Sequence, residues 1–157
     1  MHCNQNRKDK PRWNDDITGE TQGKMDQFPI DDEADRAFTP DDDLSTEHTY
    51  LIDPCSENPE DYLGFDATGQ IFATGDNIYG DETIRVFHLD RRRLRDLRSE
   101  KVYLTLETIR AMNRATERGD AEAVQDFRRL LDLIQSDTQQ FAAVARYVER
   151  DPSAFDL

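Results

Sequence analysis

Residues 47–98, EHTYLIDPCSENPEDYLGFDATGQIFATGDNIYGDETIRVFHLDRRRLRDLR, decide the fold, because strand-like segments give way here to a helical pattern. Four short segments rich in aromatic or β-branched residues predict strands, at 50–52, 63–65, 70–73 and 83–87. Gly, Pro, Asn and Asp residues separate them. The sequence Asp66-Ala67-Thr68-Gly69 is typical of a hairpin turn in which Gly69 takes a positive φ. This stretch therefore predicts a small antiparallel sheet or hairpins.

The chain beyond residue 90 has helical periodicity. A first helix is expected to begin near Asp90, Gly119 to end it, and Asp120 to cap a second helix. Ser136 with Gln139 resembles the capping box of a third helix, which Pro152 ends. One face of the second helix carries the clearest apolar stripe, made of Ala123, Val124, Phe127, Leu130, Leu131 and Ile134. The sequence therefore predicts an α+β fold with a C-terminal bundle of about three helices.

The net charge of −14 over 157 residues is spread unevenly. Acidic residues are densest at 15–60, whereas Lys and Arg gather at 7–12 and 85–129. An acidic protein repels nucleic acid, but a local basic patch can still bind phosphate. The sequence has no run of about 18 apolar residues and no segment typical of a signal peptide. Its two cysteines do not make a disulfide framework, so we expect a cytoplasmic protein with reduced thiols.

Composition divides the chain into three segments. Residues 1–12 form a basic arm, residues 13–46 an acidic and loop-rich linker, and residues 47–157 an α+β domain. Cys3 is either part of a frayed chain end or a metal ligand whose partners are missing. His48 and His88 are isolated in sequence, so we expect structural or exposed roles for them.

Arginines are concentrated where the first helix is expected to begin. Arg91, Arg95 and Arg98 share one face of that helix. They form either a solvated face paired with nearby acids, or a set of contacts to phosphate or to a partner through guanidinium groups.

Short motifs also follow one another in a recognisable order over residues 3–98. They are Cys3-Asn4 with Arg7-Lys8, Phe28-Pro29, Leu51-Ile52-Asp53-Pro54, Asn58-Pro59-Glu60-Asp61-Tyr62-Leu63, Gly69, Gly80 with Thr83-Ile84, and Leu89-Asp90-Arg91 with Leu94 and Arg98. This order resembles the HNH-type endonuclease-like proteins of bacterial Septu and retron-linked antiphage defence systems. In those systems the nuclease is encoded beside an ATPase.

The resemblance implies metal-dependent phosphodiester hydrolysis of nucleic acid, most simply DNA. A divalent ion such as Mg²⁺ would stabilise charge on the scissile phosphate. Asn4 aligns with the last ligand of that ion, and Cys3 with one of four thiolates that hold a structural Zn²⁺. Arg7 and Lys8 would contact the nucleic acid.

The sequence also departs from the family pattern. The first half of the ββα-metal motif, with its general-base His, has no counterpart, so residues 1–12 resemble a remnant of that motif. Tyr62 stands where His is usual, and Asp90 where Asn is usual. The resemblance therefore implies the C-terminal two thirds of such a nuclease, catalytically incomplete and binding neither ion by itself. Two alternatives stay open: a non-catalytic interaction module that binds the co-encoded ATPase through its helices, and a small α+β domain with a chance motif match.

Overall fold

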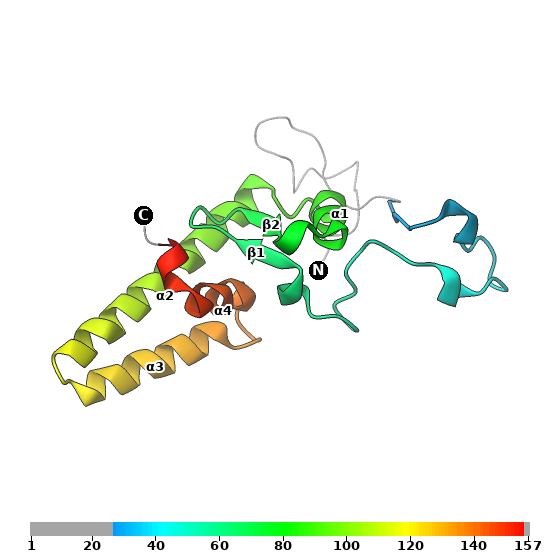
Figure 1. Ribbon diagram of the computed structural model, residues 1–157. Helices are drawn as coiled ribbons and strands as arrows, with labels where there is room; N and C mark the ends of the chain where they lie inside the picture. Colours follow the sequence, from blue (N-terminus) through cyan, green and yellow to red (C-terminus); the bar gives the residue numbers. More distant parts are fainter. Residues whose placement is uncertain (1–26, 156–157) are drawn as a thin grey trace, which may run out of the picture. The chain divides into compact units, whose positions relative to one another are not determined.

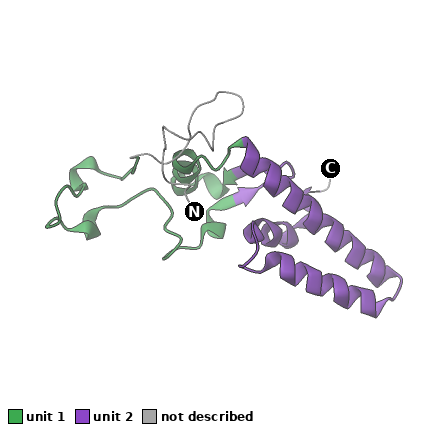
Figure 2. Cartoon of the chain, turned by 180° about the vertical axis from the view of Figure 1, so that it is seen from behind, with its two compact units in different colours: residues 1–63, 72–91 green, residues 64–71, 92–157 purple. Residues whose placement is uncertain are grey.

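The computed structural model describes residues 27–155 and has the predicted α+β fold (Figure 1). Within these residues, four α-helices and one two-stranded sheet are joined by loops with short 3-10 turns. The chain forms two compact units (Figure 2). Unit 1 comprises residues 1–63 and 72–91, and unit 2 comprises residues 64–71 and 92–157. No helix in the described part is long and apolar enough to cross a membrane.

The sheet is an antiparallel hairpin of β1, Leu63–Phe65, and β2, Ile71–Ala73. Its turn is held by Asp66, whose Oδ1 accepts hydrogen bonds from the backbone N–H of Thr68 at 2.8 Å and of Gln70 at 2.9 Å. Gly69 has a φ of +78°. The predicted turn and the strands predicted at 63–65 and 70–73 are therefore confirmed, the second to within one residue.

The strand predicted at 83–87 is wrong, because these residues belong to helix α1, Ile78–Phe87. Asn77 begins the helix, and its side chain accepts a hydrogen bond from the backbone N–H of Gly80 at 2.6 Å. Thr83 and Val86 are three residues apart, lie on one face of the helix and are buried. Their β-branched side chains resemble a strand in sequence but here line the buried side of a helix.

The strand predicted at 50–52 is also wrong. In its place the structure has one isolated antiparallel bridge, between Ile30 and Thr49. Leu51 and Ile52 are nevertheless buried, and the backbone N–H of Ile52 donates a hydrogen bond to Thr83 Oγ1 at 3.0 Å. The apolar residues thus pack in the core of unit 1 without a neighbouring strand to pair with.

Unit 2 contains the predicted three-helix bundle. Helices α2, Arg92–Glu117, α3, Ala121–Gln135, and α4, Ala142–Arg150, pack on one another. Figure 1 shows α2 and α3 as an antiparallel pair. The turn between them is as predicted, because Gly119 has a φ of +69° and the side chain of Asp120 accepts a hydrogen bond from the Ala123 N–H.

The buried face of α3 is narrower than its apolar stripe. Leu131 and Ile134 are buried, Phe127 is half-buried, and Leu130 is exposed. The capping box predicted at Ser136 is also wrong, because Ser136 ends α3 and α4 begins at Ala142. Contacts of Arg146 explain why α4 begins six residues after Ser136, where the third helix was predicted to begin.

The guanidinium group of Arg146 donates to the carbonyl oxygen of Gln135 at 2.6 Å and to Asp137 at 2.9 Å. These two bonds stabilise a loop over the residues that the sequence assigns to a helix start.

Candidate functional site

The residues predicted to bind metal and nucleic acid at the N-terminus, Cys3, Asn4, Arg7 and Lys8, lie outside the described residues. Within residues 27–155, no group of three or more His, Cys, Asp or Glu side chains is placed to hold a metal ion. Cys55 is an exposed free thiol in a turn, where its backbone N–H donates to Asp53 Oδ1 at 2.9 Å.

The three arginines predicted to share one face have different environments. Arg98 is only 3% exposed, and its Nη1 donates to the carbonyl oxygen of Gly69 at 2.9 Å. Its guanidinium group also lies 6.0 Å from the ring centre of Phe65. Arg91 belongs to unit 1, is half-buried and donates to the carbonyl oxygen of Phe87. Arg95 is exposed, so it is the member of the three most open to a phosphate or a partner.

Arg95 lines a shallow hollow beside the hairpin turn. The other lining residues are Ala67, Thr68, Asp96 and Ser99. The hydroxyl and the backbone N–H of Thr68 both donate to Asp66, so neither is directed at a ligand. Asp96 also lines the hollow, and its carboxylate lies 3.9 Å from Nε of Arg92. One cation and one anion make a hollow that suits a single weak phosphate contact.

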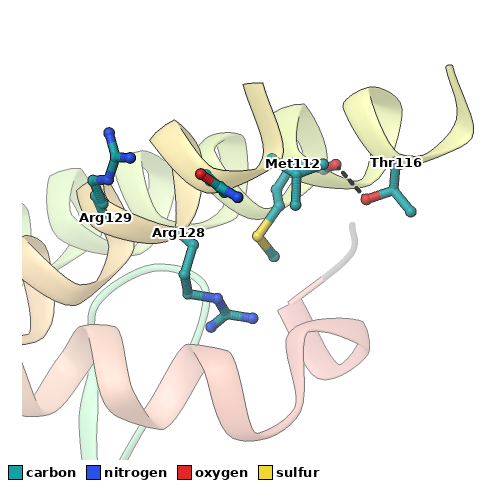
Figure 3. Close-up of a pocket in the computed structure, with 6 residues that line it drawn as sticks. Met112, Thr116, Arg128 and Arg129 are labelled. Carbon is teal, nitrogen blue, oxygen red and sulfur yellow. Dashed lines mark hydrogen bonds between the residues drawn. The ribbon is translucent and has the colours of Figure 1, made fainter. Parts of the chain in front are cut away.

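A groove between α2 and α3 is lined by Met112, Thr116, Val124, Gln125, Arg128 and Arg129 (Figure 3). Figure 3 shows that Arg128 and Arg129 leave α3 in different directions. Arg128 pairs with Glu149 of α4 at 2.7 Å, and Arg129 pairs with Asp126 at 2.9 Å. Because a carboxylate neutralises each guanidinium group, the groove is not a strong anion site.

The helices of unit 2 expose several leucines. Leu130 and Leu133 lie three residues apart on one face of α3, and their side chains are 40% and 57% exposed. Leu104 of α2 is 45% exposed and lines a hollow with Leu97 and Phe141. We call Leu104, Leu130 and Leu133 the exposed leucines.

A hollow in unit 1, which sequence reasoning missed, combines carboxylates with aromatic rings. Its volume is about 580 Å³, and the rings of Tyr50 and Tyr79 meet edge to face with centres 5.9 Å apart. We call it the acidic hollow. Its lining residues are Asp31, Glu47, His48, Thr49, Tyr50, Leu51, Asp53, Ser56, Glu57 and Tyr79. The acidic composition of 31–57 was the sequence signal, but the loop folding that gathers these residues was not predictable.

Hydrogen bonds orient the tyrosines of this region. Tyr50 donates its hydroxyl to Asp31 at 2.5 Å, and Tyr62 donates its hydroxyl to Glu57 at 2.9 Å. These bonds to a carboxylate raise the pKa of both phenols. Tyr62 also lies against Tyr79, with ring centres 6.0 Å apart. Tyr62, which departs from the motif that this part of the sequence resembles, thus contacts both Glu57 and Tyr79.

The sequence was compared with known proteins. No protein-family model matches it, and no solved structure does. It is similar to the Septu protein PtuB of Bacillus mycoides (strain KBAB4), with 31% identity over 109 residues. The similar region covers 63% of this chain and 37% of that protein, so the chain matches little more than a third of its relative's length.

Proposed function

We propose that this chain works in bacterial antiphage defence, as a component of a Septu-like system related to the HNH-type endonucleases. The observation that carries this proposal is the similarity to Septu protein PtuB over 63% of the chain. The order of motifs over residues 3–98 supports it, because that order resembles the same group of defence proteins. The reaction implied is metal-dependent hydrolysis of a phosphodiester in nucleic acid.

The roles proposed for individual residues follow from the motif. Cys3 would contribute to a structural zinc site, Asn4 to the site of a catalytic divalent ion, and Arg7 with Lys8 to contacts with nucleic acid. Of the three arginines predicted to share one face, Arg95 is best suited to a phosphate contact, because it is exposed at the start of α2.

A phage-plating assay tests the proposed role. A sensitive bacterium would carry the gene for this chain together with its neighbouring ATPase gene, or the same locus with this gene deleted. We expect plaque formation to be reduced only by the intact locus, and a plasmid copy of the gene to restore protection to the deletion strain. Equal plaque formation on both strains, with the protein present in the first, would contradict the proposal.

A second candidate function, a non-catalytic module that binds the ATPase partner, is favoured by the exposed leucines. Leu133 is 57% exposed, whereas Leu131, two residues before it on the same helix, is fully buried. Leu130 and Leu133 lie three residues apart on one face of α3, and exposed apolar patches are typical of protein interaction sites. Such a surface would be covered when the partner binds.

Co-purification of this chain with the ATPase distinguishes this candidate. The double variant Leu130→Ser with Leu133→Ser would lose the partner but keep its melting temperature, because both side chains are exposed in the free chain. The matched control is Asp132→Ser, an exposed position between them on the same helix. Retention of the partner by the double variant would exclude this surface as the docking site.

A further inference from the structure

Almost all of the net charge of this protein lies in one unit. The described residues of unit 1, 27–63 and 72–91, contain 16 Asp and Glu against 3 Arg, a net charge of −13. The described residues of unit 2, 64–71 and 92–155, contain 12 acidic and 12 basic residues and are neutral. A field of this sign repels nucleic acid and attracts cationic groups. Unit 1 is therefore suited to a basic partner.

The acidic hollow is the concave part of unit 1 where this charge meets aromatic surface. Asp31, Glu47, Asp53 and Glu57 place four carboxylates around it. Tyr79 is 40% exposed and packs edge to face on Tyr50. Aromatic faces attract ammonium and guanidinium groups, and nearby carboxylates add direct ionic contacts. Charge, concavity and aromatic surface thus coincide within one set of residues.

The carboxylates of the hollow already have partners within the protein. Asp31 accepts a hydrogen bond from Tyr50, and Glu57 accepts hydrogen bonds from Tyr62 and from the backbone N–H of Asp53. They are spread around the hollow, and the described residues offer no cluster with the spacing of metal ligands. This arrangement suits a bulky organic cation better than a metal ion.

We infer that the acidic hollow binds an arginine or lysine side chain from a basic segment of a protein partner. The ring of Tyr79 stacks on the cation, while Glu47 and its neighbouring carboxylates neutralise it. Arginine is favoured over lysine, because its planar guanidinium group stacks on aromatic rings and forms paired hydrogen bonds with carboxylates. This inference goes beyond the proposed function, since it is tested on the isolated chain and depends on neither nuclease activity nor defence.

The test is fluorescence anisotropy of a labelled tetra-arginine peptide with the full chain, and a tetra-glutamate peptide as the control. At about 0.15 M salt the screening length is about 8 Å, so remote acidic residues contribute little. We expect Tyr79→Leu and Glu47→Gln each to weaken binding about fivefold or more, and Tyr79→Phe to keep it. Asp41→Asn is the matched control, because it removes an equal charge from unit 1 outside the hollow, and it should change binding less than about twofold.

Three results would overturn the inference. The first is that the tetra-arginine peptide does not bind. The second is that Asp41→Asn weakens binding as much as Glu47→Gln while Tyr79→Leu has no effect, because this indicates diffuse attraction to the whole unit. The third is that the chain associates with itself and that Tyr79→Leu abolishes this association, because the hollow would then bind a second copy of the chain. Melting curves check that each variant is folded. If Tyr79→Leu does not fold, Glu47→Gln still tests the inference.

Discussion

Arg98 donates a hydrogen bond from Nη1 to the carbonyl oxygen of Gly69 across 2.9 Å, and this bond joins α2 to the hairpin turn within unit 2. The approach is close, because a Cβ on Gly69 would lie 2.2 Å from the carbonyl oxygen of Arg95 and 2.5 Å from the nitrogen of Ser99. The turn thus rests directly on the backbone of the helix. Glycine permits this contact because it has no Cβ, and it also adopts the positive φ of the turn without strain.

We expect Gly69→Ala to destabilise unit 2 by about 2–4 kcal/mol, from a left-handed backbone and a forced backbone contact. Gly119→Ala is the matched control in the same unit, because Gly119 also has a positive φ but nothing within 4 Å of its Cβ position. It should cost about 1 kcal/mol. Urea denaturation of both variants measures the difference, and equal free energies of unfolding would contradict the close contact.

Arg98→Ala is expected to destabilise the protein by about 2–5 kcal/mol, because it leaves the buried carbonyl of Gly69 without this donor. Arg95→Ala, on an exposed position of the same helix, should change the free energy of unfolding by less than about 0.5 kcal/mol. If Arg95 contacts phosphate, its variant should instead weaken binding to nucleic acid. A small stability effect at Arg98 would show that its hydrogen bond is not structural.

These two arginines illustrate what the sequence alone could predict. Helical periodicity correctly placed them one turn apart on α2, and the turn at Asp66 to Gly69 was predicted from its residues. The burial of Arg98 was not predictable, because it arises when a hairpin 29 residues away in sequence packs on the helix. Helix α1 was missed for a related reason, since its β-branched residues favour a strand locally and packing overrides that preference.

Leu131 and Leu133 lie on opposite sides of the boundary between the buried and the exposed face of α3, so their substitutions should affect stability differently. Leu131 is fully buried, so Leu131→Ala should cost about 2–5 kcal/mol. Leu133 is 57% exposed, so Leu133→Ala should change the free energy of unfolding by less than about 0.5 kcal/mol. Phe127 is only half-buried and should lie between them. Thermal melts of the three variants test this order, and a large effect at Leu133 would show that its side chain is covered in solution.

The acidic turn at 38–42 should lose order in acid. Asp42 accepts hydrogen bonds from the backbone N–H groups of Phe38 at 2.7 Å and Thr39 at 2.8 Å. These bonds, with Thr39 contributing most, lower the pKa of Asp42 below its ordinary value of 3.8. The carboxylate therefore stabilises the turn at a pH above 3.8, and this stabilisation is lost as the pH falls through the lowered pKa.

Amide shifts of Phe38 and Thr39, followed by NMR during an acid titration, measure this transition. Its midpoint should lie below 3.8, and Asp42→Asn should abolish it. A midpoint at or above the ordinary value would mean that the two hydrogen bonds do not persist in solution.

We propose that this folded chain is required for defence against phage. The most direct measurement is the efficiency of plating on bacteria whose locus encodes the natural chain, no chain, the Gly69→Ala variant or the Gly119→Ala variant. Protection should be kept with the natural chain and with Gly119→Ala. It should be lost in the deletion strain and, at a temperature where that variant is unfolded, with Gly69→Ala. Undiminished protection in the deletion strain would contradict this role.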